Sequence, residues 1–258
     1  MMTIQILALD FDGVICDGLV EYFETAWRTY CQIWKLSLST PPADLAASFY
    51  QLRPVIETGW EMPVLIKALA LGITDAKILE DWSAIAAELL KESALTAADI
   101  GRQLDQIRDE WIATDLASWL NLHRFYPGVV EQLQSLLASP VQPMIVTTKE
   151  GRFVKALLQQ QGVQMPEQWI IGKESKRPKP QILLELIGKN GTPPSLWFVE
   201  DRLKTLQLVQ KQPDLDAVKL YLADWGYNTA SERATAHHDP RIQLLSLSQF
   251  GEELSAWP

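Results

Sequence analysis

The sequence contains few cysteines and few histidines, and its net charge is not positive. Cys16 and Cys31 are the only cysteines among 258 residues, which is too few for a disulfide framework or a thiolate zinc site. The three histidines, His123, His237 and His238, lack the spacing of a helical zinc-binding pair, so we assign them no metal. The formal net charge of −9 argues against the clustered Lys and Arg that bind nucleic acid.

Long apolar runs are also absent. No stretch has the roughly 20 apolar residues that cross a bilayer. The first apolar run lacks the flanks of a signal peptide and is interrupted by Asp10. We therefore expect a cytoplasmic protein with reduced cysteines and no membrane partner. Hydrophobic residues still make up 47% of the chain, which is enough for one big domain or two modest ones.

The hydrophobic pattern changes along the chain. Residues 19–124 are predicted to be almost entirely helical, because apolar residues recur at helical spacing in segments such as EYFETAWRTYCQIWKL. Thr96 is predicted to cap one of these helices. Strand-like segments later alternate with helices predicted at residues 129–137, 152–161, 181–187 and 203–210, which is typical of βαβ units.

These patterns predict an α/β protein. A first strand at Ile4–Asp10 is expected to begin a Rossmann-like parallel sheet with helices on both faces. Breaks near Gly18 and at Pro127-Gly128 interrupt this sheet domain. We expect a core domain made of residues 1–18 and 125–258, with an all-helical domain at residues 19–124 inserted into it.

Polar side chains follow three of the predicted strands. They are Asp10 and Asp12 in ALDFDG, Thr147, Thr148 and Lys149 in MIVTTK, and Glu200 and Asp201 in LWFVED. Because ligands bind outside the carboxyl ends of parallel strands, we expect these side chains to share one crevice. Carboxylates two residues apart on a strand point the same way and repel each other, and a cation relieves that repulsion. Clustered oxygen ligands favour Mg²⁺, held together with a substrate phosphate.

The order of these segments resembles the haloacid dehalogenase-like (HAD) superfamily of phosphatases and phosphotransferases. DFDGVICDG is similar to its first motif, VTTK to its second, the KRPKP region to its third and VED to its fourth. FYPGVVEQLQSLL and LADWGYNT resemble stretches that accompany these motifs. The helical insert between the first two motifs resembles the α-helical cap of the C1 type.

The resemblance implies a Mg²⁺-dependent phosphatase that hydrolyses a small-molecule phosphate monoester. Asp10 would be the nucleophile that forms an aspartyl-phosphate. Asp12 would protonate the leaving oxygen and then activate water. Thr147 would hold the phosphate. Asp201 would bind Mg²⁺ together with Asp10 and the backbone carbonyl of Asp12.

The sequence departs from the family pattern at two positions. The lysine that usually precedes P-x-P is replaced by Arg177, with Lys176 and Lys179 as neighbours, so which cation enters the site stays open. The second aspartate of the fourth motif is replaced by Thr205. Glu200 is the candidate metal ligand that compensates for it.

In the insert, the segment LRPVIETGWEMP lies between predicted helices. Caps of this family lower a loop onto the substrate, so Arg53, Trp60 and Glu61 are candidate substrate contacts, with Thr148 as a further one in the core. The simpler alternative is a surface loop without such a role.

Other residues also have simple structural alternatives. The DxDG segment is compatible with a turn, and the threonines of VTTK with a cap for the following helix. Lys176, Arg177 and Lys179 are compatible with a solvated charge run. Glu200 and Asp201 are compatible with the acidic first turn of a helix.

Alternative functions also stay open. A phosphomutase or a 2-haloacid dehalogenase would use the same fold, although Asp12 disfavours the dehalogenase, which usually lacks the second aspartate. A non-catalytic relative that binds a phosphate ligand is the alternative outside the enzymes. We expect the partner to be a small phosphorylated metabolite, while its identity and the oligomeric state are not readable from the sequence.

Overall fold

The computed structural model describes residues 5–37, 40–188 and 195–258. Contacts between Cα atoms divide the chain into two compact units. One contains the chain up to Asp17 together with Arg124–Pro258, and the other is Gly18–His123. We refer to them as the core unit and the helical unit and describe each by itself.

The core unit contains a six-stranded sheet with the order β5-β4-β1-β6-β7-β8, in which all neighbouring strands are parallel. Its strands are β1 (Ile6–Leu9), β4 (Gln142–Val146), β5 (Ile170–Ile171), β6 (Leu196–Glu200), β7 (Lys219–Ala223) and β8 (Ile242–Leu245). A short antiparallel pair joins β2 (Cys16–Asp17) to β3 (Arg124–Phe125). Ile4, the first residue of the predicted first strand, lies outside the described residues.

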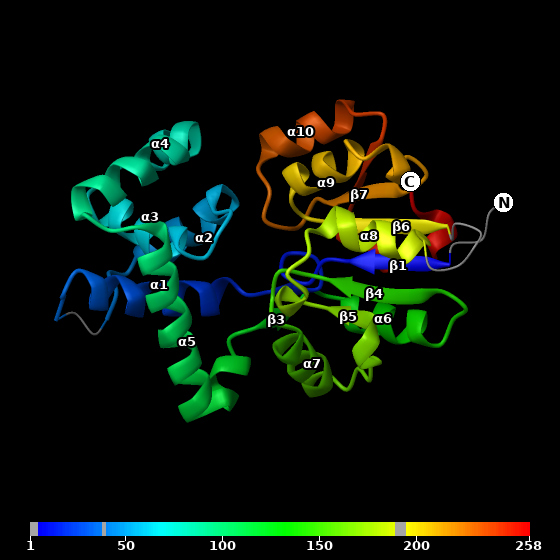
Figure 1. Ribbon diagram of the computed structural model, residues 1–258, viewed down its shortest axis with the longest axis horizontal. Coiled ribbons are helices and arrows are strands. Elements are labelled where there is room, and N and C mark those ends of the chain that lie inside the picture. Colours follow the sequence, from blue (N-terminus) through cyan, green and yellow to red (C-terminus); the bar gives the residue numbers. More distant parts are fainter. Residues whose placement is uncertain (1–4, 38–39, 189–194) are drawn as a thin grey trace. The chain divides into compact units, whose positions relative to one another are not determined.

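Helices cover both faces of this sheet. The helices of the core unit are α6 (Val129–Leu137), α7 (Gly151–Gln160), α8 (Lys179–Gly188), α9 (Leu203–Gln210), α10 (Ala230–His238) and α11 (Leu247–Phe250). Figure 1 shows α8 and α9 on one face and α6 and α7 on the other. Short 3-10 turns are η2 (Glu167–Trp169), η3 (Lys173–Ser175), η4 (Pro213–Leu215) and η5 (Leu254–Ala256). The predicted α/β fold with a parallel sheet is confirmed.

Alternate strand residues face opposite layers of the core, as the pleat requires. Ile6 and Ala8 of β1 belong to a buried apolar cluster that also includes Leu183 of α8 and Leu206 of α9. Removing such side chains from water is the main favourable contribution to folding. The central strands are therefore held rigidly, which fixes the residues that follow them.

The strand register brings three chain segments to one level at the carboxyl edge of the sheet. Leu9 at the end of β1 lies opposite Ile145 of β4 and Val199 of β6. The backbone amide of Asp10 donates to the carbonyl of Val199 at 2.9 Å. Asp10 is thus fixed next to the end of β6.

The helical unit consists of α1 (Leu19–Ile33), α2 (Leu45–Leu52), η1 (Arg53–Val55), α3 (Glu61–Ala70), α4 (Asp75–Ser93) and α5 (Ala97–Leu120). The predicted cap at Thr96 is confirmed, because its side chain accepts from the amide of Asp99 and the Asp99 side chain bonds back to the Thr96 amide. Both α4 and α5 are interrupted by a non-helical aspartate, Asp81 and Asp115. Each of these aspartates caps the helical segment that follows it.

A charge pair between a buried glutamate and a partly exposed arginine links two helices of this unit. Glu21 of α1 is fully buried, and Arg108 of α5 donates to both of its carboxylate oxygens, at 2.8 and 3.2 Å. Thr25 and the indole of Trp119 donate to the same carboxylate. A buried charge requires such partners. Within the described ranges, no helix combines the length and the apolar character needed to cross a membrane.

Candidate active site

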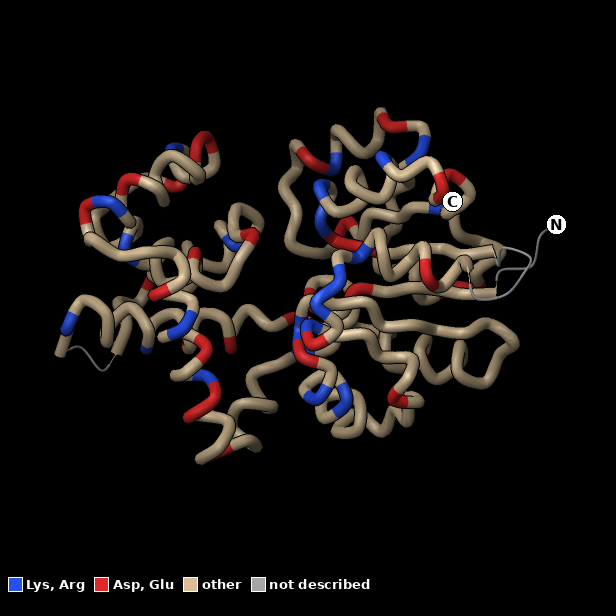
Figure 2. The backbone as a smooth tube through the Cα atoms, viewed as in Figure 1, with Lys and Arg blue, Asp and Glu red and all other residues tan. Residues whose placement is uncertain are grey.

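Three carboxylates meet at the carboxyl ends of β1 and β6. Asp10, Glu200 and Asp201 are buried, and each offers one oxygen within 4.8 Å of the others. In Figure 2, acidic and basic segments of the core unit lie close together in the region where the central strands of Figure 1 end. The structure thus brings together residues that are about 190 positions apart in the sequence, as expected for neighbouring parallel strands.

The electrostatics of this cluster favour a cation. Burial, followed by the charge of Glu200, raises the pKa of Asp10 to about 7. Burial also raises the pKa of Glu200 to about 7, with the charge of Asp201 adding to the effect. Three buried carboxylates carry more negative charge than one lysine can offset. Their hard oxygen donors fit Mg²⁺.

Lys179 is the cation that enters the cluster. Its ammonium lies 2.9 Å from Asp10 Oδ1 and 2.6 Å from Glu200 Oε2. Burial alone lowers the pKa of Lys179, but the charges of Asp10 and Glu200 outweigh it, so this pKa lies above its ordinary value. Arg177 pairs instead with Glu185 at the surface. Lys176 is exposed.

Asp12 is held by a different lysine. Lys149 Nζ lies 3.2 Å from Asp12 Oδ1 and 3.5 Å from Oδ2. Lys149 follows Thr147, which is buried and whose hydroxyl accepts from the Lys149 amide at 3.2 Å. Thr148 is exposed. The N-cap residue of α7 is Glu150, so the alternative that a threonine caps this helix is wrong.

The loop after β7 fixes Asp201. The amide of Tyr227 donates to Asp201 Oδ2 at 2.8 Å, and the side chain of Asn228 donates to the Asp201 carbonyl at 2.9 Å. A Cβ on Gly226 or on Gly13 would overlap Asp201. Gly13 also has a φ of +88°, which disfavours any other residue. The segment LADWGYNT resembles a stretch that accompanies the HAD motifs, but this resemblance assigned no role to Tyr227 or Asn228.

The fourth-motif position without an acid is Thr205, which is half-buried on α9. Glu200 is one residue before Asp201 and is part of the carboxylate cluster. The backbone amide of Arg202 donates to Glu200 Oε1 at 3.1 Å. The other carboxylate oxygen of Glu200, Oε2, pairs with Lys179.

Arg53, Trp60 and Glu61 belong to the helical unit. Arg53 donates to the carbonyl of Ile56 at 3.0 Å, and its guanidinium lies 5.1 Å from the centre of the Tyr22 ring. Trp60 is half-buried at the N-cap position of α3. The Glu61 carboxylate accepts from the backbone amides of the preceding loop and from the Trp82 indole, so it holds that loop in place. The assignment of Arg53 and Trp60 to substrate binding stays a prediction.

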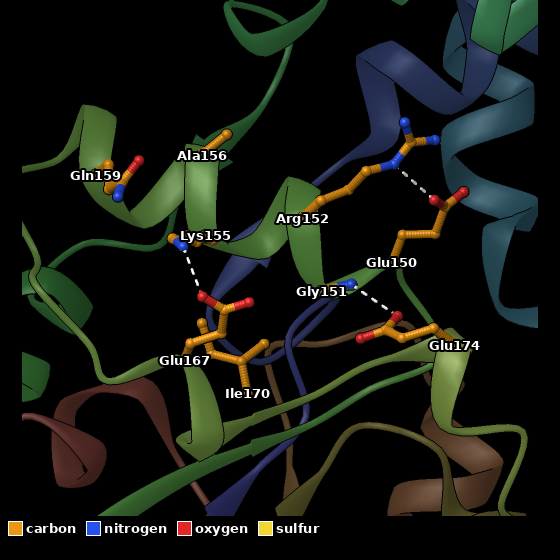
Figure 3. Close-up of a pocket in the computed structure, with 9 residues that line it drawn as sticks. All are labelled: Glu150, Gly151, Arg152, Lys155, Ala156, Gln159, Glu167, Ile170 and Glu174. Atoms are coloured by element: carbon orange, nitrogen blue, oxygen red, sulfur yellow. Dashed lines mark hydrogen bonds and ion pairs between the residues drawn. The ribbon is translucent and has the colours of Figure 1, made fainter.

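A cavity of about 410 Å³ lies elsewhere in the core unit, beside α7 and β5. Figure 3 shows that charged side chains around it pair with each other, Arg152 with Glu150 and Lys155 with Glu167. Glu174 accepts from the amide of Gly151 at the start of α7. None of the predicted site residues lines this cavity.

The chain is similar to known phosphatases. It is 30% identical over 228 residues to a phosphoglycolate phosphatase of Pseudomonas putida KT2440, a match that covers 87% of this chain and 71% of the relative. No family model matches the chain.

Solved structures share the fold at lower identity. A predicted phosphoglycolate phosphatase from Haemophilus somnus 129PT matches with a TM-score of 0.61 and 18% identity, covering 97% of both chains. A protein from Bacteroides fragilis, described as a haloacid dehalogenase-like hydrolase, matches with a TM-score of 0.57 and 19% identity, covering 96% of this chain and 99% of the other. The chain therefore belongs to the haloacid dehalogenase-like hydrolase superfamily, and its helical insert after the first strand is consistent with a C1-type cap.

Proposed function

We propose that this protein is a cytoplasmic, Mg²⁺-dependent phosphatase that hydrolyses a small-molecule phosphate monoester through an aspartyl-phosphate at Asp10. The observation that carries the proposal is the meeting of Asp10, Glu200 and Asp201 at the carboxyl edge of the sheet, with Lys179 between two of them. Phosphate monoesters hydrolyse very slowly without an enzyme, so positioned charge is the main contribution that a site has to supply.

The residues of the core unit divide the chemistry among them. Asp10 attacks phosphorus, and Asp12 gives a proton to the leaving oxygen and later takes one from water. Thr147 holds a phosphate oxygen. Lys179 keeps the Asp10 carboxylate in place and offsets the negative charge around it. We assign the positive charge of the third motif to Lys179 rather than to Arg177, which pairs with Glu185.

Asp10, Asp201 and the backbone carbonyl of Asp12 are the proposed ligands of Mg²⁺, with Glu200 as the further acid of the set. When bound, the ion supplies positive charge that neutralises the phosphate and the carboxylates around it. The geometry of Asp201 supports this assignment, because the Tyr227 amide and the close packing of Gly13 and Gly226 fix its carboxylate.

The relatives suggest the class of substrate. Because the curated relative of Pseudomonas putida is a phosphoglycolate phosphatase, we propose a small phosphorylated metabolite such as 2-phosphoglycolate. Arg53 and Trp60 of the helical unit, and the exposed Thr148 of the core unit, are the proposed substrate contacts. This assignment rests on the resemblance of the insert to a C1 cap.

The proposal is tested by measuring phosphate release from a panel of phosphate esters, including p-nitrophenyl phosphate and 2-phosphoglycolate, with Mg²⁺ and with EDTA. We expect turnover that requires Mg²⁺ and that Asp10→Asn abolishes. Tight binding of phosphate esters without turnover of any of them would instead indicate a non-catalytic binding protein. Metal-independent release of halide from a 2-haloacid would indicate a dehalogenase.

A further inference from the structure

Two lysines pair with three of the four carboxylates at the strand ends. Lys179 contacts Asp10 and Glu200, whereas Lys149 contacts Asp12. The three-carboxylate cluster includes Asp10, Glu200 and Asp201 but not Asp12. We propose that Lys149 is a positioning residue that holds the Asp12 carboxylate away from the metal cluster and toward the leaving group, an inference that rests on the proposed phosphatase function.

The backbone around Lys149 is fixed at three points. The amide of Thr147 donates to the carbonyl of Ile171, and the hydroxyl of Thr147 accepts from the Lys149 amide. The carbonyl of Lys149 accepts from the Lys173 amide at 2.9 Å. The turn after β4 is thus tied to the segment after β5, and the Lys149 side chain starts from a rigid base.

The contact between Lys149 and Asp12 is sheltered from water. The two side chains are only 8% and 16% exposed. Ion pairs at the surface contribute little, because water and salt screen them, but a sheltered pair restricts both side chains. Since the ammonium reaches both carboxylate oxygens, at 3.2 and 3.5 Å, it constrains the orientation of the whole Asp12 carboxyl group.

Without Lys149, Asp12 would be a fourth carboxylate two residues from Asp10. Its side chain would be free to turn toward the proposed Mg²⁺ ion. Such a rotation would remove the acid from the leaving oxygen. Lys149 and Asp12 come from the turns after β4 and β1, which are neighbouring strands, so the sheet itself sets their separation. Lys149 therefore acts through Asp12, and the phosphate is held by other groups.

This role has a specific chemical consequence. In the first step an Asp10 oxygen bonds to phosphorus while the bond from phosphorus to the leaving oxygen breaks, and the leaving oxygen keeps that electron pair and takes the proton of Asp12. The ammonium of Lys149 stabilises the carboxylate that Asp12 becomes. In the second step Asp12 takes a proton from the water that bonds to phosphorus, and the bond between phosphorus and Asp10 breaks to release inorganic phosphate.

A general acid matters most when the leaving group is poor. We therefore compare kcat/KM for p-nitrophenyl phosphate, which has a good leaving group, with kcat/KM for phenyl phosphate, which has a similar shape and a poorer one. This parameter reports the steps up to departure of the alcohol. The ratio of the two values within one enzyme sample does not depend on how much of that sample is folded.

We expect Lys149→Met to lower kcat/KM for phenyl phosphate by about tenfold or more beyond its effect on p-nitrophenyl phosphate, in line with the ~10²- to 10⁴-fold contribution of general acids. Asp12→Asn should show the largest selective loss of kcat/KM for phenyl phosphate. Lys149→Arg should restore much of the wild-type ratio of kcat/KM between the two substrates. Lys155→Met is the matched control, because Lys155 lies on α7 and pairs with Glu167 at the surface. Its ratio should equal that of the wild type.

Equal losses on both substrates in Lys149→Met would overturn the inference and would indicate that Lys149 binds the phosphate itself or only supports the fold. An unchanged ratio and unchanged rates would overturn it as well. Failure of the underlying phosphatase function looks different, because the wild-type protein would then release no phosphate from either substrate.

Discussion

The Lys179 ammonium lies 2.9 Å from Asp10 Oδ1, although Lys179 is two residues beyond the position where the HAD motif carries its lysine. That usual position is occupied by Arg177, which pairs with Glu185. Lys179 is the first residue of α8, so its side chain leaves the start of a helix whose position is fixed by packing on the sheet. A positive charge thus contacts the carboxylates from a position two residues further along the chain than the motif predicts.

Replacing Lys179 tests whether Lys179, rather than Arg177, supplies the positive charge of the third motif. We expect Lys179→Met to lower kcat by about 10²- to 10³-fold, the range found when one preorganised electrostatic partner is removed from an active site. Arg177→Met is the contrasting variant and should lose less than about tenfold. The measurement is phosphate release at saturating Mg²⁺, with circular dichroism as the check on folding. A larger loss in Arg177→Met than in Lys179→Met would return the role to the arginine.

The raised pKa values of Asp10 and Glu200 predict how stability depends on pH without metal. Each carboxyl has a folded pKa of about 7, well above its unfolded value, so the folded state binds more protons between about pH 4 and pH 7. These two groups therefore favour folding at low pH, and their contribution is lost as the pH rises toward 7. We expect Mg²⁺ to reverse this, because the proposed site would bind it through the deprotonated carboxylates.

Thermal unfolding at pH 5 and pH 7.5, with EDTA and with Mg²⁺, checks this prediction. We expect the increase in Tm caused by Mg²⁺ to be larger at pH 7.5 than at pH 5. Asp10→Asn removes one of the titrating groups and so should be more stable than the wild type in EDTA at pH 7.5, with a smaller difference at pH 5. A Mg²⁺ effect that is the same at both pH values would show that these carboxylates do not control metal binding.

Asn228 is predicted to support Asp201, one of the proposed metal ligands. Its side-chain amide donates to the backbone carbonyls of Asp201 and Ala223, and its oxygen accepts from Arg233. We expect Asn228→Ala to weaken Mg²⁺ binding by about 10- to 100-fold, as is typical when a group that orients a metal ligand is lost. Calorimetric titration with Mg²⁺ measures this directly. Asn121→Ala, an exposed substitution in the helical unit, is the control and should bind Mg²⁺ as the wild type does.

Loss of Glu21 is predicted to destabilise the helical unit, because its fully buried carboxylate is the ion-pair partner of Arg108. Glu21→Ala leaves Arg108 and the Trp119 indole without their shared carboxylate, and we expect the free energy of unfolding to fall by about 3–5 kcal/mol. Urea denaturation measures the change. Glu24→Ala is the matched control on the same helix, because Glu24 forms only an exposed pair with Arg28. A similar small effect for both variants would mean that the pair of Glu21 and Arg108 contributes little.

The carboxylate cluster could be predicted from the sequence because it depends on strand order and on strand ends. Asp10 and Glu200 both come at the end of apolar strands, and parallel neighbours place such ends together. The alternating pattern from Val129 onward gave the helices α6 and α9 with their observed bounds. Local periodicity is sufficient for features of this kind.

The partners of the lysines could not be predicted in this way. Whether Lys149 turns toward Asp12, and whether Lys179 or Arg177 enters the cluster, depends on turn geometry and on where α8 begins. Asn228 was missed for the same reason, since its contact with Asp201 joins residues that are 27 positions apart in the sequence.

The helix α10 was also missed. Its nine residues are mainly polar, and only Ala236 is buried, so no apolar periodicity marks it. The available signal was the capping box formed by Thr229 and Glu232, which satisfies the spacing of a helix start. The Thr-x-x-Glu spacing marks this helix start without any hydrophobic pattern.

The central claim is that Asp10 takes up the phosphoryl group, and peptide mapping after rapid acid quench tests it most directly. The protein is mixed with Mg²⁺ and p-nitrophenyl phosphate, quenched within the first turnovers, digested, and analysed by mass spectrometry. We predict a phosphorylated peptide that contains Asp10 in the wild type and none in Asp10→Asn. Turnover by the wild type with the phosphoryl group on another residue would contradict the account.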